Sequence, residues 1–355
     1  MKILTEPIGS IPRPKYLIDG MNAFSEQLIN ETELNNLLDE ALKDTIKRFE
    51  ETGSPVITDG EQGKPSFATY PVAGLKTLAP GGVIIPFADG HTRQLPKLTT
   101  GPFRYQGYAS SYVSKAKKLT SLPVKQAVIA VSAISLLYPQ EGITGYDQQA
   151  FVSDLLNEAE ADIRQSLQAG AYNVQIDFTE ARLALKLDPG AGLLKSFIEL
   201  NNKVLERFTM EERKRIGVHS CPGGDHDSTH SADINYADLL PWLFQLKAGN
   251  FYLEYAAEKN KQAVLKAIKQ NMHTDQHLFL GVIDVLNPRI ETPEEVRDII
   301  LEAIEVIPLA QFGTTDDCGF SPFADDDSTS RNTAFEKITA RIKGTELAEI
   351  IVSKN

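Results

Sequence analysis

An alternation of strand patterns and helix patterns predicts a (β/α)8 barrel, also called a TIM barrel. Short apolar runs that end in polar loops recur along the chain, and most of them are followed by an amphipathic helical pattern. Such alternation is typical of a parallel sheet covered by helices. The length of 355 residues suits one barrel, with residues 1–355 as a single domain. An open, doubly wound sheet is the alternative, but no Gly-x-Gly-x-x-Gly motif follows any run.

Each strand is predicted from a short apolar run that ends at Gly, Pro or a carboxylate. The eight predicted strands are 2–4, 55–58, 125–131, 172–177, 215–218, 250–253, 278–284 and 309–313. Helical periodicity predicts helices near 32–52, 147–169, 191–208, 236–246, 259–270 and 330–350. A further helix opens at Thr292, with Pro293 at its first position and Glu295 at its third, which is a capping box.

One segment does not fit this alternation. Residues around 80–105 contain two apolar stretches on either side of Asp89-Gly90, a strong hairpin turn signal. We therefore expect a β-hairpin insertion around 80–105 that leaves the barrel near its active face.

Composition excludes several kinds of partner. The net charge of −12, from 36 basic and 48 acidic residues, argues against nucleic acid and anionic membrane. No apolar run approaches the roughly 18 residues of a membrane span, and the start of the chain does not resemble a signal peptide. The expectation is a cytoplasmic protein, in which the two cysteines are metal-ligand candidates and not a disulfide.

Polar side chains recur where the predicted strands end. In a (β/α)8 barrel the carboxyl ends of all strands open on one face, and the chemistry takes place there. In chain order this face receives Ser10, Glu61, Tyr138, Asp177, His219, Cys221, Glu254, Asp284, Asn287 and Cys318.

His219 and Cys221 suggest a metal site. Residues two apart on a strand point the same way, so an imidazole and a thiol lie on one side. The more ordinary interpretation is a buried thiol beside a hydrogen-bonded histidine. Adding Glu254 and Cys318 from nearby strand ends gives a set that suits tetrahedral Zn²⁺. His226 and His230, in the polar loop after Cys221, are rival ligands.

These motifs, in this order, resemble the catalytic domain of cobalamin-independent methionine synthase. The resemblance covers nearly the whole chain. It rests on Ile8-Gly9-Ser10, Asp59-Gly60-Glu61, Gln175-Ile176-Asp177, His219-Ser220-Cys221, Glu254, Asp284 with Pro288-Arg289, and Asp317-Cys318-Gly319.

The resemblance implies roles for the matching residues. It implies His219, Cys221, Glu254 and Cys318 as zinc ligands. It further implies that Ser10 and the backbone at Ile8 bind the amino-acid carboxylate, that Glu61 and Asp177 bind the amino group, and that Tyr138 replaces a Trp that stacks on folate.

The chain departs from the family on the side of the methyl donor. Full-length members have two barrels, whereas one is expected here. Leu286 stands where the family has a histidine suspected in proton transfer, and the loop after Cys221 is longer than usual. The residue that protonates the leaving nitrogen is therefore left open among Asp284, His226 and His230. We expect weak or no activity with free methylfolate alone.

The resemblance implies a methyltransferase that makes methionine from homocysteine, whose thiol is activated as a zinc thiolate. The donor is methyltetrahydrofolate or a methyl group carried by a partner protein. One alternative is a zinc-dependent thiol alkyltransferase that uses another electrophile, such as an epoxide. Another is a non-catalytic thiol-binding subunit of a methyl-transfer complex. A metal-independent decarboxylase on the same barrel would lack this ligand set.

Overall fold

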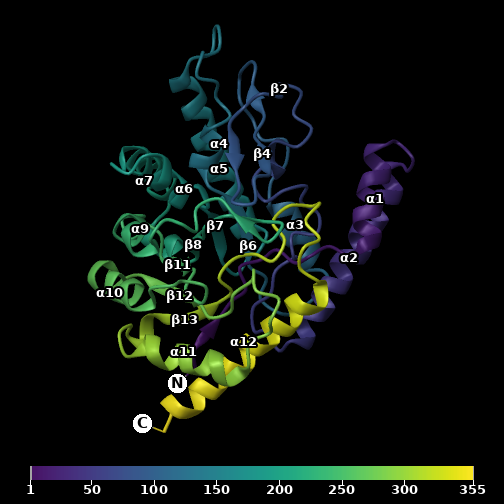
Figure 1. Cartoon of the computed structure of the whole chain (residues 1–355). Helices are drawn as coiled ribbons and strands as arrows, with labels where there is room; N and C mark the ends of the chain where they lie inside the picture. The colour runs from purple at the N-terminus through teal and green to yellow at the C-terminus, as the bar shows by residue number, and fades with distance from the viewer. Residues whose placement is uncertain (1, 355) are drawn as a thin grey trace.

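The computed structural model describes residues 2–354 and has the predicted (β/α)8 architecture. Seven parallel strands pair in the order β1-β13-β12-β11-β8-β7-β6. Figure 1 shows them in the middle of the molecule, with helices around the outside. Their bounds are β1 Leu4–Thr5, β6 Gln126–Ile129, β7 Val174–Asp177, β8 Ile216–Ser220, β11 Asn250–Leu253, β12 His277–Gly281 and β13 Phe312–Thr315.

The eighth position in the ring is filled by the segment around Ile57. The predicted strand at 55–58 is reduced to one parallel bridge between Ile57 and Val124. Pro55 has no N–H for a ladder, and Thr58 turns its hydroxyl onto the Gly9 carbonyl at 2.8 Å. The barrel is therefore closed between this segment and the loop after β1 by side-chain and loop contacts.

The predicted long helices are all present, within a few residues of their predicted ends. They are α2 Glu31–Glu51, α5 Gln148–Gln168, α7 Gly192–Leu205, α9 Tyr236–Leu243, α10 Lys261–Asn271, α11 Pro293–Ile304 and α12 Arg331–Val352. The capping box predicted at Thr292 is confirmed, because Thr292 accepts from the Glu295 N–H and Glu295 accepts from the Thr292 N–H.

Several helices in the structure are not predicted from the sequence. These are α1 Lys15–Ser25, α3 Ser110–Ala116, α4 Val131–Ser135, α6 Glu180–Leu187 and α8 Met210–Arg213. The 11-residue α1 begins directly after Pro14 and lies beside α2, at the edge of the molecule in Figure 1. The others have eight residues or fewer, too short for a clear periodic signal.

The predicted hairpin insertion is confirmed, and it contains two antiparallel strand pairs. β2 (Leu78–Ala79) pairs with β5 (Lys97–Leu98), and β3 (Ile84–Pro86) pairs with β4 (Thr92–Gln94). Gly90 has a φ of +95°, as a tight turn requires. A second hairpin, β9 (Gly224–Asp225) with β10 (Ser228–Thr229), lies in the loop after Cys221.

The barrel interior contains buried charges as well as apolar residues. Glu6, Lys125, Asp316 and Arg341 are all buried. The Arg341 guanidinium lies 2.7 Å from Asp316 and donates to the Glu6 carbonyl at 3.0 Å. Among the helices of residues 2–354, none is long and apolar enough to cross a membrane.

Candidate active site and metal centre

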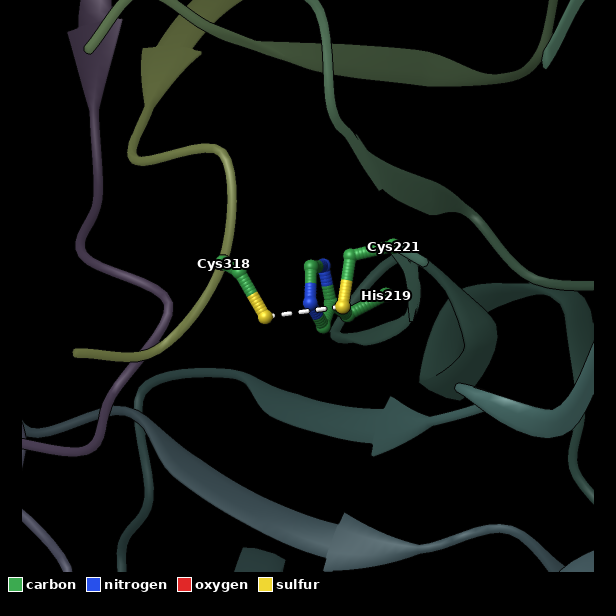
Figure 2. A group of neighbouring side chains, drawn as sticks. All are labelled: His219, Cys221 and Cys318. Atoms are coloured by element: carbon green, nitrogen blue, oxygen red, sulfur yellow. Dashed lines mark hydrogen bonds between the residues drawn. The ribbon is translucent and has the colours of Figure 1, made fainter. Parts of the chain in front are cut away.

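His219, Cys221 and Cys318 come together where β8 and β13 end. Their ligand atoms all lie within 4.8 Å of one another, and Figure 2 shows the imidazole and the two thiols converging. The two Sγ atoms are 2.7 Å apart. β8 carries His219 into the barrel mouth and releases Cys221 one residue after its end, so the two side chains meet as the sequence predicts.

The chemistry of this group fits a metal ion. The Nδ1 atom of His219 lies 3.1 Å from the Tyr252 carbonyl, while its buried Nε2 atom has no hydrogen-bond partner. A buried polar atom without a partner is costly unless something binds it. Proximity to Cys221 lowers the pKa of Cys318, whereas burial raises that of Cys221. One imidazole and two sulfurs are a ligand set that Zn²⁺ favours.

Glu254 lies close to this group but outside it. Its Oε2 atom accepts a hydrogen bond from Nη1 of Arg182 at 3.1 Å, and both side chains are buried. Burial and the neighbouring Asp317 raise the pKa of Glu254 well above its usual value. The structure thus brings three of the four predicted ligands together, and Glu254 is an adjacent, ion-paired carboxylate.

A cavity with an empty volume of about 600 Å³ opens beside the metal group. His219, Cys318 and Gly319 line one part of it. Predicted substrate residues line it as well, namely Ile8, Ser10, Glu61 and Asp177. Its remaining wall is largely apolar and includes Phe67, Ile85, Phe87, Pro322 and Phe323.

Glu61 and Asp177 each have one oxygen fixed by the protein. Lys64 donates to Oε1 of Glu61 at 2.9 Å, and the amide of Gln175 donates to Oδ1 of Asp177 at 2.7 Å. Burial, with the nearby Glu61 charge, raises the pKa of Asp177 to about 6. Two carboxylates in one cavity, with a single lysine beside them, form a site that favours a further cation.

The predicted carboxylate-binding role of the Ile8 backbone stays a prediction, because the structure gives its N–H another acceptor. Its backbone N–H already donates to Oδ2 of Asp316 at 3.2 Å and is not free for a substrate. Ser10 does line the cavity, and its Oγ atom accepts from the Ser321 N–H at 3.2 Å, which leaves its own hydroxyl proton as a donor. A Cβ at Gly319 would lie 2.1 Å from this oxygen, so only glycine fits there.

Tyr138 does not line the cavity. Its hydroxyl donates to the Tyr146 carbonyl at 2.8 Å, and its ring packs against Phe151. This differs from the predicted folate-stacking position, and the cause is local: the chain turns into α4 directly after β6, and Tyr138 follows that helix.

The three residues predicted as candidate proton donors lie in different places. His230 lines the cavity, and burial lowers its pKa to about 4. His226 lies outside the cavity, with Nε2 3.2 Å from Nη2 of Arg93. Asp284 lines a smaller cavity together with Leu286 and Cys318, and it accepts the Leu286 N–H at 3.0 Å.

Sequence reasoning missed the residues that support the site. Lys64 follows Glu61 by three positions, and this short spacing was a usable signal. Lys125, buried below the site, donates to Oε1 of Gln175 at 2.8 Å. No local pattern indicates this contact, because Lys125 directly precedes β6 while Gln175 lies on the neighbouring strand β7.

A three-part clasp covers the cavity. It consists of the β3–β4 hairpin, the β9–β10 hairpin and the loop 320–329. Arg93 joins all three, with Nε 2.5 Å from Oδ2 of Asp225 and Nη1 2.9 Å from Oδ2 of Asp325. The Ala88 N–H also donates to the Thr229 carbonyl at 2.9 Å.

The fold and the site define a barrel enzyme in which a histidine and two cysteines that could hold a metal ion lie beside a cavity containing two carboxylates. Comparison with known proteins agrees. Residues 3–334 match the family described as "Cobalamin-independent synthase, Catalytic domain". The chain belongs to this family and is a methyltransferase.

The relatives match nearly the whole chain. The methionine synthase of Thermococcus kodakarensis is 23% identical over 346 residues, which are 97% of this chain and 92% of the relative. That of Sulfurisphaera tokodaii is 24% identical over 359 residues, 97% of this chain and 91% of the relative. A solved structure of a B12-independent methionine synthase from Shewanella sp. W3-18-1, in complex with selenomethionine, has a TM-score of 0.77, 18% identity and full coverage of both chains.

Proposed function

We propose that this protein transfers a methyl group to the thiol of homocysteine and forms methionine, with Zn²⁺ held by His219, Cys221 and Cys318. One observation carries the proposal. His219, whose Nε2 atom is unpartnered, and Cys318 line a cavity that also contains Glu61 and Asp177, and the Cys221 thiol lies against Cys318. A ligand with a thiol at one end and an ammonium group at the other matches both features.

Zinc at this group would supply a Lewis acid that keeps a substrate thiol deprotonated at neutral pH. The protein's own residues then orient the amino acid. The Glu61 and Asp177 carboxylates attract its ammonium group, and the Ser10 hydroxyl donates to its carboxylate. Glu254, which lines the adjoining small cavity together with Cys318, would be the carboxylate nearest to hand as a fourth ligand.

The Glu61 and Asp177 pair favours this function over a general thiol alkyltransferase. A simple alkyl thiol has no ammonium group to offset two buried carboxylates. Calorimetry with homocysteine and with propanethiol separates the two functions. We expect homocysteine to bind at least tenfold more tightly, a difference of about 1.4 kcal/mol. Equal affinities would support the alkyltransferase.

Metal analysis tests the zinc assignment. We expect about one zinc per chain in the native protein, and loss of zinc in Cys221→Ser and His219→Ala. His226→Ala is the matched control, because this histidine lies outside the metal group and should leave zinc content unchanged. Circular dichroism confirms folding of each variant. Full zinc content in folded Cys221→Ser would contradict the assignment.

A non-catalytic thiol-binding role predicts a different result. Such a protein would bind zinc and homocysteine but form no methionine with any donor until a second protein is added. Methionine formation by the purified chain alone excludes that role.

A further inference from the structure

We propose that the methyl donor is a small organic cation, a sulfonium or quaternary ammonium compound, whose onium group binds against the aromatic wall of the cavity. This inference rests on the proposed function and names its second substrate. Three observations carry it: the aromatic wall of the cavity, the acidic clasp that covers this wall, and the lack of a charged acid beside the wall.

The aromatic wall is formed by Phe67, Phe87 and Phe323, which line the same cavity as His219 and Cys318. Their positions are fixed by neighbours. Phe87 stacks on His91 with ring centroids 4.4 Å apart, and Phe67 meets Phe323 edge to face at 5.5 Å. Aromatic faces attract cations, and quaternary ammonium groups are commonly recognised in this way.

The clasp that covers this wall is acidic. Arg93 lines the cavity and lies over one face of Phe323, 4.4 Å from the ring centroid. Its charge is offset by Asp225 and Asp325, which both pair with it. Asp326 adds a further carboxylate, 3.8 Å from Nδ1 of His226. These carboxylates disfavour the binding of a polyanionic donor and favour that of a cationic one.

The aromatic wall of the cavity offers no charged acid for a nitrogen leaving group, since Asp177, which also lines the cavity, is assigned to the ammonium group of homocysteine. Besides Arg93, which is held by two carboxylates, the aromatic wall has His230 beside Phe87, with ring centroids 5.6 Å apart. Its lowered pKa, near 4, leaves it neutral at pH 7. Leu286 lines the adjoining small cavity and has no proton to give. Asp284 in that cavity is engaged by a backbone N–H.

An onium donor needs no such acid. The homocysteine sulfur, already deprotonated, forms a bond to the methyl carbon while the bond from that carbon to the positive sulfur breaks. The electron pair of the broken bond stays on the leaving sulfur, which departs as a neutral thioether. The products are methionine, the thioether and the proton that the thiol released on binding. A tertiary amine leaves in the same way from a quaternary ammonium donor.

Binding measurements on the metal-free protein test the aromatic site without turnover. Choline and its neutral carbon isostere 3,3-dimethylbutanol differ in charge and share a shape. We expect choline to bind roughly tenfold more tightly. Phe87→Leu and Phe323→Leu should reduce this ratio to about twofold, and Phe87→Tyr should retain it, because tyrosine keeps the aromatic face. Equal binding of the two probes to the native protein would overturn the inference.

Turnover is then measured with zinc and homocysteine, with trimethylsulfonium, S-methylmethionine and methyltetrahydrofolate as donors. We expect methionine and the matching thioether from the sulfonium donors. If homocysteine binds and only methyltetrahydrofolate yields methionine, the inference fails while the proposed function stands. If homocysteine does not bind the zinc-loaded protein, both fail.

Discussion

A chain of hydrogen bonds runs from the barrel interior to the substrate cavity. The ammonium group of Lys125 donates to Gln175, and the amide of Gln175 donates in turn to Asp177. Since Lys125 can only donate, it fixes the orientation of the Gln175 amide, with the NH₂ group toward Asp177. The carboxylate is thereby held at one oxygen, and hydrogen bonds to charged groups contribute about 1.5–3 kcal/mol each.

Gln175→Met should loosen Asp177 without removing its charge. We expect homocysteine to bind about tenfold more weakly, as loss of one such bond implies. Affinity for propanethiol, which has no ammonium group, should not change. Calorimetry with both thiols measures the two effects on the same protein. A parallel loss for both would indicate general damage to the cavity.

Homocysteine binding should depend on pH through Asp177. Burial raises the pKa of this carboxyl group to about 6, so it is ionised above pH 6 and protonated below. Its attraction for the ammonium group is therefore lost as the pH falls through 6. We expect the dissociation constant to rise between pH 7 and pH 5, and Asp177→Asn should remove this dependence. An unchanged profile in the variant would assign the effect to another group.

Among the secondary-structure elements, the sequence predicts best those with local signals. Helices α2 and α11 carry their own caps and apolar stripes, and both are found where expected. The clasp has no local signal. Arg93 meets Asp225 and Asp325 across separations of 132 and 232 residues. Likewise, the position of Tyr138 depends on the short helix α4, which is only five residues long.

Arg93→Met should release the clasp. Asp225 has no exposed side-chain surface, so losing the guanidinium leaves a buried carboxylate poorly paired. We expect faster amide exchange in residues 84–94 and 224–229, with little change in the barrel strands. Arg289→Met is a suitable control, because it also removes an ion pair, to Glu295, but at an exposed site. Equal exchange in both variants would show that Arg93 does not hold the clasp.

At the scale of the whole molecule, the barrel and its active face could be predicted, because each strand–helix unit is encoded in a contiguous stretch. The metal group follows from that fold, since strand ends converge on one face. The roles of Ile8 and Glu254 could not be resolved in this way. They depend on Asp316 and Arg182, partners that only the folded chain brings near.

Zinc should stabilise the entire barrel. A ligand that binds only the folded state at 100 times its Kd adds about 2.7 kcal/mol. For a chain of 355 residues this corresponds to a rise in Tm of roughly 3–4 °C. Calorimetric scans with and without zinc measure it. Cys221→Ser should show no rise, and a similar rise in that variant would place the stabilising metal elsewhere.

The pairing of β1 with β13 has a consequence for how the protein is made. The first strand finds its neighbour only near the end of the chain, and Glu349 and Arg341 of α12 fasten the segment around it. Until β13 has been made, β1 and β12 therefore each lack a neighbouring strand on one edge. Such edges invite association with other chains. We therefore expect the growing chain to be most prone to association before β13 and α12 have been made.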